Sequence, residues 1–463
     1  MPQLKKTMFR EYDIRGKESP DELNVESIYH IVRGFSVMLA ARGISQAVIG
    51  HDSRGTSEAF YQSAIKALRE SGISVIEIGT VTTPMSYWAQ YHVRVKGLVM
   101  ITASHNPVGW NGLKLGTDFS TTLLSDEIQE LYDSILHESY VWGEGSIENR
   151  DIKDAYFSDI VSRISLQKKL KVLVNTGNGT AGMYAPKLLR RFGCDVIEHF
   201  TEVDPTYPHY TPDPAGTDMM EDTGVQVRKH GCDIGVAFDG DGDRLGITDE
   251  NGKVVWPDHY IALLSRTILS KYPGAKIVFD VKVSQSLPDD IRAHGGVPIM
   301  WKTGHSYIKS KLAEEKAPLA GEGSGHIFFS DFYGFDDAFY AGLTLLEYLS
   351  RHDAPLSKIV SDLPHYITTP TIHVDTTDEE KYAIVAALTD SFKKEGYAVN
   401  DINGARVSID DGWGLVRASS NTPNLVLRFE AKKQDTLDSI QEIFREKLSK
   451  FASVSSVWNS SGH

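Results

Sequence analysis

Short apolar segments alternate with amphipathic ones along most of this chain, and this alternation limits the folds open to it. The first round has a helix pattern over 25–41, a strand pattern over 47–50, a helix pattern over 58–69 and a strand pattern over 73–78. Strands that alternate with helices of this length form βαβ units, whose strands pair mostly in parallel. The sequence therefore predicts an α/β fold with mixed, mostly parallel sheets.

The same alternation recurs twice, and the last part of the chain departs from it. The pattern lapses around 141–151 and again around 363–370, where we place domain boundaries. After the second lapse, several strands follow one another between two helices, which is typical of a small α+β domain with antiparallel strands. We therefore expect three α/β domains and a C-terminal α+β domain, with the boundaries 1–148, 149–254, 255–366 and 367–463.

Composition excludes several classes of protein. The 463 residues exceed what one hydrophobic core usually organises, and 41% apolar with 24% charged residues is typical of a globular protein. A formal charge of −14 argues against nucleic acid or an anionic membrane as a partner, and no apolar run approaches the length of a membrane span. Cys194 and Cys232 are too few for a disulfide framework. We expect a cytoplasmic protein that binds neither nucleic acid nor membrane.

A polar segment follows the predicted strand over 98–101. It reads Thr-Ala-Ser-His-Asn-Pro at 102–107. In open α/β sheets ligands bind beyond the carboxyl ends of the strands, so Ser104 would lie where an exposed nucleophile belongs. From this segment alone, a turn capped by Ser104 and Asn106 explains the residues equally well.

A second strand pattern ends in three carboxylates at alternate positions, Asp239, Asp241 and Asp243. The glycines between them allow the loop to curl until the oxygens converge, and a hard divalent cation would relieve the repulsion. Together with Glu250 these carboxylates have the spacing of an EF-hand, but its sixth position, which requires glycine, is Arg244. A solvated acidic turn is the other alternative. The pattern favours Mg²⁺, which readily shares its coordination shell with a phosphate oxygen.

Two segments of the third round carry polar side chains around glycines. Lys302 and His305 bracket a glycine after a predicted strand, and Glu322, Ser324 and His326 lie in a segment with three glycines. A carboxylate such as Glu322 can accept hydrogen bonds from two hydroxyl groups in a fixed geometry. Taken by itself, the second segment is equally typical of a flexible loop.

The last domain contains one loop suited to phosphate. Arg417 is followed by Ser419, Ser420, Asn421 and Thr422 between two predicted strands. A guanidinium group followed by hydroxyl and amide groups can bind a phosphate. The spacing alone favours an ordinary polar hairpin loop.

These motifs, in this order, resemble those of the α-D-phosphohexomutase family. Residues 102–107 match the family's phosphoserine loop at every position, and residues 239–244 match its Mg²⁺ loop, Asp-Gly-Asp-Gly-Asp-Arg. Tyr12 and Arg15 match a Tyr-x-x-Arg-Gly segment whose arginine reaches into the active site. In the Arg417 loop the chain departs from the family, which usually has Asn and Thr at positions 420 and 421. The resemblance implies three related α/β domains and a smaller C-terminal domain around one central cleft.

The resemblance also implies a mechanism. Phosphorylated Ser104 would transfer its phosphoryl group to a hexose 1-phosphate, and the resulting bisphosphate would turn over and return the other phosphoryl group. The candidates for proton transfer are Lys114, His105 and Arg15. We favour Lys114, assisted by His105, because burial among cations can lower a lysine's pKa. The implied catalytic residues are Ser104, His105, Lys114, Arg15 and Arg244. The implied metal ligands are Ser104, Asp239, Asp241 and Asp243. The implied substrate-binding residues are Tyr12, Lys282, Lys302, His305, Glu322, Ser324, His326, Arg417, Ser419, Ser420, Asn421 and Thr422.

The implied substrates are hexose 1- and 6-phosphates of mannose, glucose or both, with Mg²⁺ as cofactor and glucose 1,6-bisphosphate or mannose 1,6-bisphosphate as activator. The segment 321–326 resembles the version found in glucose and mannose phosphomutases. The nearest alternative is a phosphoglucosamine mutase, which commonly has Gln where this chain has Gly323. A non-catalytic, Mg²⁺-dependent sugar-phosphate binding protein is the alternative from another class, and Ser104 argues against it. We expect a monomer or a weak homodimer.

Overall fold

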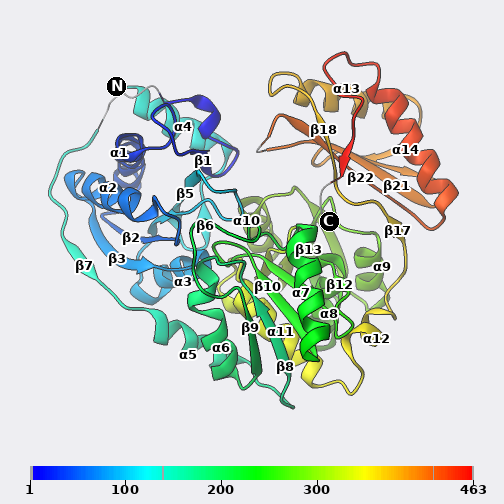
Figure 1. Ribbon diagram of the computed structural model, residues 1–463. Coiled ribbons are helices and arrows are strands. Elements are labelled where there is room, and N and C mark those ends of the chain that lie inside the picture. Colours follow the sequence, from blue (N-terminus) through cyan, green and yellow to red (C-terminus); the bar gives the residue numbers. More distant parts are fainter. Residues whose placement is uncertain (1–3, 138–139, 421, 461–463) are drawn as a thin grey trace. The chain divides into compact units, whose positions relative to one another are not determined.

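The structure is a computed structural model that describes residues 4–137, 140–420 and 422–460 (Figure 1). Its contacts divide the chain into two compact units. The first contains the residues up to Pro214 together with Asp218–Val254 and Gly325–Ser357. The second contains Ala215–Thr217, Val255–Ser324 and the residues from Lys358 onward.

The first sheet of the first unit is mixed. Its strands lie in the order β1-β5-β4-β2-β3-β7, with β6 paired to β5. β4, β2, β3 and β7 are parallel, whereas β5 runs antiparallel to both β4 and β1. The strands are β1 (Ile14–Lys17), β2 (Gln46–His51), β3 (Ser74–Thr80), β4 (Gly97–Ile101), β5 (Trp110–Asp118), β6 (Thr121–Thr122) and β7 (Ile147–Asn149).

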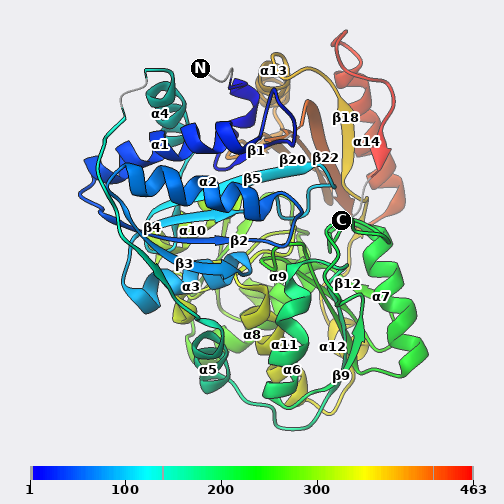
Figure 2. The same cartoon turned by 60° about the vertical axis from the view of Figure 1, so that its left-hand side comes forward.

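Helices cover both faces of this sheet. Figure 2 shows α1, α2 and α4 on one side, where they share a core with the strands, and α3 on the other. The helices are α1 (Val25–Ala41), α2 (Ser57–Glu70), α3 (Thr83–Val93) and α4 (Ser125–Leu136). α1 begins where the sequence predicts, because the Asn24 side chain accepts hydrogen bonds from the backbone N–H groups of Glu26 and Ser27.

The second sheet of the first unit has the order β12-β11-β10-β8-β9. β10, β8 and β9 are parallel, and β11 is antiparallel to β10. The strands are β8 (Lys171–Asn175), β9 (Asp195–His199), β10 (Ile234–Phe238), β11 (Leu245–Thr248) and β12 (Val254–Val255). The helices of this part, together with the short strand before α11, are α5 (Lys153–Arg163), α6 (Ala185–Phe192), α7 (Thr217–His230), β16 (Ile327–Phe329) and α11 (Ala338–Ser350).

The second unit contains a parallel group of strands in the order β14-β13-β15. These strands and the helices around them are α8 (Pro257–Lys271), β13 (Lys276–Asp280), α9 (Ser286–Ala293), β14 (Val297–Trp301), α10 (His305–Glu315) and β15 (Leu319–Gly321). Each strand is followed by a loop that carries polar residues singled out from the sequence. The carboxyl ends of parallel strands meet at one edge of a sheet, so these loops share an edge.

An antiparallel sheet completes the second unit, in the order β19-β20-β21-β22-β18-β23, with β17 paired to β22. Both α13 and α14 pack on one of its faces. The elements are β17 (Ile367–Thr368), β18 (Ile372–Asp375), α13 (Lys381–Lys394), β19 (Ala398–Asn400), β20 (Ala405–Ile409), β21 (Gly412–Ala418), β22 (Asn424–Ala431), α14 (Gln434–Leu448) and β23 (Asn459–Ser460). α12 (Leu356–Val360) precedes this sheet.

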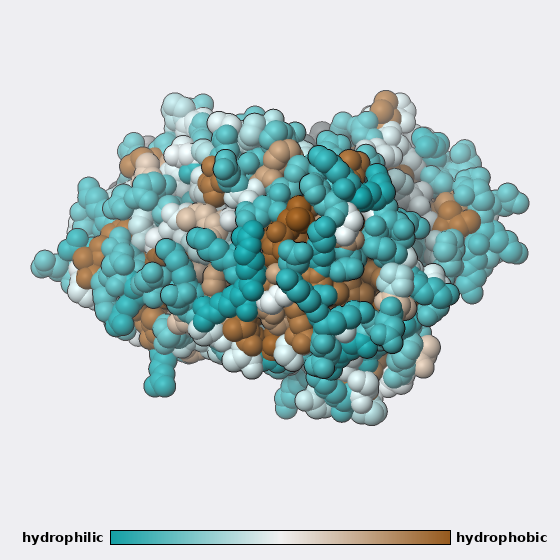
Figure 3. All heavy atoms as spheres, turned by 60° about the horizontal axis from the view of Figure 1, so that its bottom comes forward, coloured by the Kyte–Doolittle hydropathy of each residue, from teal (hydrophilic) through white to brown (hydrophobic). Residues whose placement is uncertain are grey.

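The predicted fold class is confirmed: the α/β parts have mixed, mostly parallel sheets, and the C-terminal part is α+β. The sequence analysis did not identify α3 and α7. The residues of α3 from Thr83 to Gln90 are all buried, so this stretch has no solvent-exposed face that would produce the usual amphipathic period. The face in Figure 3 is largely hydrophilic, with hydrophobic residues interspersed. In the described ranges, no helix has both the length and the apolar character that a membrane span requires.

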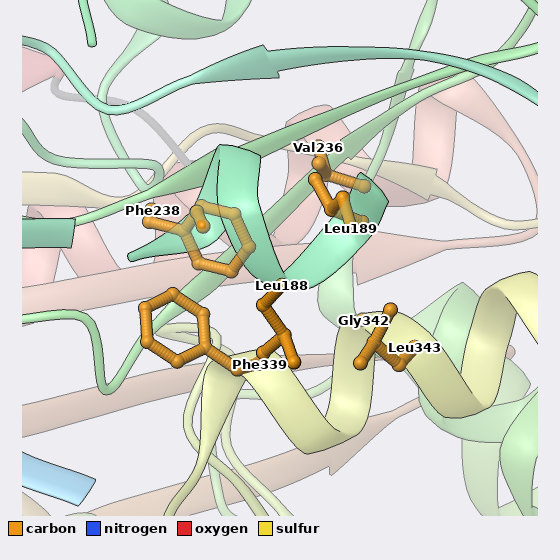
Figure 4. Close-up of a pocket in the computed structure, with 8 residues that line it drawn as sticks. Leu188, Leu189, Val236, Phe238, Phe339, Gly342 and Leu343 are labelled. Atoms are coloured by element: carbon orange, nitrogen blue, oxygen red, sulfur yellow. The ribbon is translucent and has the colours of Figure 1, made fainter. Parts of the chain in front are cut away.

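A small apolar void of about 10 Å³ lies between α6, β10 and α11. Figure 4 shows the side chains around it, with Gly342 on α11 contributing none. The lining residues are Ala185, Leu188, Leu189, Val236, Phe238, Phe339, Gly342 and Leu343. A Cβ at Gly342 would lie 3.4 Å from Leu245 Cδ1 and 4.0 Å from Phe238 Cζ, which are ordinary contacts.

Gly342→Ala should therefore stabilise the protein. Alanine in a helix interior is favoured over glycine by about 1 kcal/mol, and the added methyl group finds free space. Gly224→Ala in α7 is the matched control, because its Cβ would lie 2.1 Å from the carbonyl oxygen of Gly252. Calorimetric melting should give a higher Tm for Gly342→Ala and a lower one for Gly224→Ala. A lower Tm for both would contradict the packing described around α11.

Candidate active site

Ser104 lies in a sharp loop between β4 and the antiparallel β5. Its backbone has φ of 51°, in the left-handed region that residues with a side chain rarely adopt. Such a conformation costs on the order of 1 to 3 kcal/mol and persists only where the surroundings impose it. The side chain is buried, and Oγ donates a 2.6 Å hydrogen bond to Asp239 Oδ2. Ser104 Oγ also lies 3.2 Å from His105 Nδ1.

The acidic loop follows β10 and packs directly on the Ser104 loop. Asp239, Asp241 and Asp243 are fully buried, and oxygen atoms of the three lie within 4.8 Å of one another. Gly240 is required here, because a Cβ at this position would lie 2.4 Å from the carbonyl oxygen of Ser104. Strands β10 and β11 flank the loop, so it is not an EF-hand.

Protein donors hold both oxygens of Asp239, one of them through Ser104 Oγ, and one oxygen of Asp241. Asp239 Oδ1 accepts hydrogen bonds from the backbone N–H groups of Asp243 and Arg244. Asp241 Oδ2 accepts hydrogen bonds from Thr83 Oγ1 at 2.6 Å and from Thr102 Oγ1 at 3.1 Å. The backbone and these hydroxyl groups therefore fix the orientation of the carboxylates.

The remaining oxygens make this cluster suited to a cation. Asp243 Oδ2 forms an ion pair with Lys114 Nζ. Asp241 Oδ1 and Asp243 Oδ1 are buried without a hydrogen-bond partner among the described residues. Asp243 Oδ1 does lie 3.5 Å from His326 Nδ1, which is too long for a good hydrogen bond. A buried carboxylate oxygen without a hydrogen bond is costly, and a hard cation such as Mg²⁺ would satisfy both oxygens. The residues present therefore fit a Mg²⁺ ion.

Burial and charge perturb the protonation of this cluster. Burial, with repulsion from Asp243 and Asp241, raises the pKa of Asp239 well above its usual value. Burial acts in the same direction on Asp241, but Lys114, the hydrogen bond from Thr83 and Arg15 together outweigh it and lower the pKa of Asp241. The pKa values of two neighbouring carboxylates are thus shifted in opposite directions, as expected where one cation lies among several anions.

The expected lowering of the Lys114 pKa is wrong. Burial does oppose the ammonium charge, but Asp241 and Asp243 outweigh it and raise the pKa of Lys114 well above its usual value. Carboxylates surround this lysine where the sequence analysis placed cations. His105 behaves in the opposite way: burial, with the charges of Arg244 and Arg15, holds its pKa well below the usual value. Lys114 is therefore charged and His105 neutral.

Two arginines and a histidine complete the group in the first unit. Arg15, on β1, donates to Asp13 Oδ2 at 2.9 Å and to the carbonyl oxygen of Thr102 at 3.3 Å. Arg244 Nε donates a 3.0 Å hydrogen bond to His326 Nε2. His326 Nδ1 in turn lies 2.9 Å from Asp336 Oδ2. The first unit thus brings together Arg15, Ser104, His105, Lys114, Asp239, Asp241, Asp243, Arg244 and His326, while Tyr12 lies just before β1.

Five of the other predicted residues lie in the second unit, in the loops that follow β13, β14 and β15. Lys282 follows β13, Lys302 and His305 follow β14, and Glu322 and Ser324 follow β15. Ser324 Oγ donates to Glu322 Oε2 at 3.2 Å. Because the three strands are parallel neighbours, all five residues lie at their common carboxyl edge.

Asp280, which the sequence analysis missed, links these loops. It is fully buried at the end of β13. Its Oδ1 accepts a 3.0 Å hydrogen bond from the Gly323 N–H, and its Oδ2 accepts a 2.8 Å hydrogen bond from Thr303 Oγ1. The charged group at the end of a buried strand was the available signal, although its partners lie far away in the sequence.

Polar side chains on either side of position 421 in the C-terminal loop hydrogen-bond to one another. Arg417 donates to Ser420 Oγ at 3.2 Å, and Ser419 Oγ lies 2.8 Å from Thr422 Oγ1. Asn421 lies outside the described residues. His373, also missed from the sequence, is nearby: burial, with the charges of Lys282 and Arg417, lowers its pKa. The second unit therefore holds a group of cationic and polar side chains suited to an anion.

The fold and these side chains define an α/β protein with a buried serine beside an acidic loop that is suited to a cation. Four models of the phosphoglucomutase/phosphomannomutase family match the chain. They are α/β/α domain I at residues 6–141, domain II at 154–252, domain III at 256–366 and the C-terminal domain at 372–447. The chain belongs to the phosphoglucomutase/phosphomannomutase family.

The similarity to known proteins covers nearly the whole chain. A phosphomannomutase/phosphoglucomutase of Pseudomonas putida is 42% identical over 446 residues, which cover 96% of each chain. A crystal structure of a family protein from Burkholderia thailandensis has a TM-score of 0.89 at 38% identity, covering 96% of this chain and 98% of that one. An N-acetylphosphoglucosamine mutase of Aspergillus fumigatus, solved with GlcNAc-6P and magnesium, has the same fold at 13% identity, with a TM-score of 0.57 and 94% of each chain covered.

Removing one carboxylate should weaken Mg²⁺ binding. Asp241→Asn replaces an anionic oxygen ligand, so its dissociation constant for Mg²⁺ should rise at least about tenfold, by isothermal titration calorimetry. Mg²⁺ at a hundredfold excess over its dissociation constant should stabilise the unsubstituted protein by about 2.7 kcal/mol. Asp249→Asn is the control: this buried carboxylate accepts backbone hydrogen bonds at the β11 turn, outside the cluster. Equal Mg²⁺ affinity of Asp241→Asn and Asp249→Asn would contradict the site.

Proposed function

We propose that this protein is a phosphohexomutase that interconverts the 1- and 6-phosphates of mannose, glucose or both through phosphorylated Ser104 and a bisphosphorylated sugar. Its membership in the phosphoglucomutase/phosphomannomutase family makes it an intramolecular phosphotransferase. The observation that carries the proposal is the hydrogen bond between Ser104 Oγ and the buried Asp239 carboxylate. It puts a serine hydroxyl at the cation-binding loop, as phosphoryl transfer requires.

The proposed metal ligands are Asp239, Asp241, Asp243 and Ser104. Bound Mg²⁺ would neutralise charge that develops on the transferred phosphoryl group. Arg244, held by His326 Nε2, would stabilise the same charge from a fixed position. Preorganised charge of this kind is usually the largest contribution to such catalysis.

We propose complementary proton-transfer roles for His105 and Lys114. When Ser104 attacks the bisphosphate, the P–O bond to the sugar breaks, a P–O bond to Ser104 Oγ forms, and the serine proton must leave. His105 is neutral and 3.2 Å from Ser104 Oγ, so it can accept this proton and return it in the reverse step. Lys114 is charged, so it can donate a proton to the sugar oxygen as that oxygen leaves.

The substrate contacts proposed from the sequence lie mainly in the second unit. Glu322 and Ser324 would bind the sugar hydroxyl groups, and the Arg417 loop would bind the phosphate that is not reacting. The remaining proposed contacts are Tyr12, Lys282, Lys302, His305, His326, Ser419, Ser420, Asn421 and Thr422. We also propose glucose 1,6-bisphosphate or mannose 1,6-bisphosphate as the activator, and domain boundaries after residues 148, 254 and 366. The expected monomer or weak dimer and the cytoplasmic location stay predictions.

The sugar preference can be measured directly. Turnover of the 1-phosphates of glucose, mannose and glucosamine, followed by coupled assays under one set of conditions, should rank glucose and mannose above glucosamine. The highest turnover on glucosamine 1-phosphate would instead support the phosphoglucosamine mutase alternative.

Ser104 should accept phosphate covalently. Incubation with glucose 1,6-bisphosphate should add one phosphoryl group, located on Ser104 by peptide mapping with mass spectrometry. Ser104→Ala should lose nearly all turnover while keeping its Tm, because only the acceptor oxygen is removed. Unlabelled Ser104, together with full activity of Ser104→Ala, would contradict the proposed function.

Arg417→Ala should weaken retention of the bisphosphate. A charge-assisted hydrogen bond contributes on the order of 1.5 to 3 kcal/mol, so KM should rise roughly tenfold to a hundredfold. Free bisphosphate should also escape during turnover, and the variant should need more added bisphosphate. Arg445→Ala, on the surface of α14, is the control. An unchanged KM and an unchanged bisphosphate requirement for Arg417→Ala would leave the loop an ordinary hairpin.

A further inference from the structure

Arg54 is a buried cation around which the Ser104 loop is folded. It follows β2, and its guanidinium donates to four backbone carbonyl oxygens of the segment 104–110. Nη2 donates to the carbonyl oxygens of Ser104 and Asn106, both at 2.6 Å. Nη1 donates to those of Pro107 at 3.1 Å and Trp110 at 3.2 Å.

The guanidinium is itself held on three sides. Asp52 Oδ2 lies 3.3 Å from Arg54 Nε, and Asp52 Oδ1 accepts hydrogen bonds from the Arg54 N–H and from Ser57 Oγ. The centroid of the Tyr207 ring lies 5.3 Å from Cζ of Arg54, within range of a cation–π interaction. Since all these groups are packed around it, the guanidinium has a fixed position.

Only arginine fits these acceptors. A planar guanidinium presents five N–H donors in a rigid fork, whereas a lysine ammonium is a compact charge on a flexible chain. Lysine at this position would keep the charge but could not reach the carbonyl oxygens of both Ser104 and Trp110 in the same geometry.

We propose that Arg54 is a positioning residue for phosphoryl transfer: it imposes the left-handed conformation of Ser104 and so holds Ser104 Oγ at Asp239. This inference rests on the proposed function, in which Ser104 is the phosphoryl carrier. The strained φ of 51° at Ser104 needs neighbours that enforce it. Two groups close on the Ser104 carbonyl oxygen, the Arg54 fork and the backbone at Gly240. Gly240 belongs to the acidic loop. Because Arg54 holds the same carbonyl oxygen that Gly240 packs against, it fixes the position of Ser104 relative to the carboxylates.

Arg54→Lys should lower kcat and leave KM nearly unchanged. A displacement of about 1 Å at a reacting group can lower a rate about a hundredfold, so kcat should fall roughly tenfold to a hundredfold. The substrate-binding residues do not contact Arg54 in this proposal, so KM should stay within about twofold. Phosphorylation of Ser104 by glucose 1,6-bisphosphate, measured by quench and mass spectrometry, should slow by the same factor as kcat.

Arg33→Lys is the matched control. Arg33 is also a fully buried arginine of the first unit, and it donates to the carbonyl oxygen of Val141 at 2.8 Å, away from the Ser104 loop. Arg33→Lys should lower Tm and keep the unsubstituted protein's kcat. If both substitutions affect only Tm, Arg54 is merely structural and the inference is overturned.

A milder variant covers the case in which Arg54→Lys does not fold. Asp52→Asn keeps the Oδ1 acceptor but replaces Oδ2, which faces Arg54 Nε, with an amide group. We expect kcat to fall about threefold to tenfold with KM unchanged, and an unchanged kcat would contradict the inference. If the unsubstituted protein turns over with phosphate on Ser104 while Arg54→Lys and Asp52→Asn match it in kcat, only the inference fails. If Ser104 of the unsubstituted protein takes up no phosphate, the proposed function fails and the inference with it.

Discussion

Three buried carboxylates converge in the loop after β10, and Lys114, Thr83, Thr102 and Ser104 bind them. Asp239, Asp241 and Asp243 repel one another in a region from which water is largely excluded, where such repulsion is strong. The loop can persist because Lys114 on β5 supplies a cation and Thr83, at the start of α3, donates a hydrogen bond from its hydroxyl group. Asp241 Oδ1 and Asp243 Oδ1 nevertheless accept no hydrogen bond from the residues that the structure describes, and two hard oxygen ligands suit Mg²⁺. The site and the packing of the two sheets therefore depend on the same charges.

The backbone conformation at Ser104 also serves the acidic cluster, because it brings the serine beside the aspartates. The left-handed conformation of Ser104 lowers the stability of the fold, and it places the serine hydroxyl group in hydrogen-bond contact with Asp239. Gly240 permits the close approach, and Arg54 gathers the carbonyl oxygens that the sharp loop would otherwise leave unpaired. Strain at a proposed catalytic serine is consistent with a group that must meet a phosphoryl donor in one orientation.

The sequence was informative wherever one local pattern decides the structure. Helix α1 was predicted from its apolar residues at helical spacing, and Ser104 and the three aspartates were identified because each follows an apolar strand. Residues that act through distant partners were not identified: Arg54, Thr83 and Asp280 carry no motif of their own. The first eight residues of α3, which begins at Thr83, are all buried. The pKa of Lys114 was predicted in the wrong direction for the same reason, since its neighbours come from a loop about 130 residues away.

The central claim is that the phosphoryl group on Ser104 is the one that reaches the sugar. Protein labelled on Ser104 with radioactive phosphate can be mixed with unlabelled glucose 1-phosphate in the presence of Mg²⁺ and quenched within one turnover. The account predicts that the label leaves the protein and appears in hexose phosphates at a rate no slower than kcat. Label that stays on Ser104 while glucose 6-phosphate forms, or that leaves only as inorganic phosphate, would contradict it.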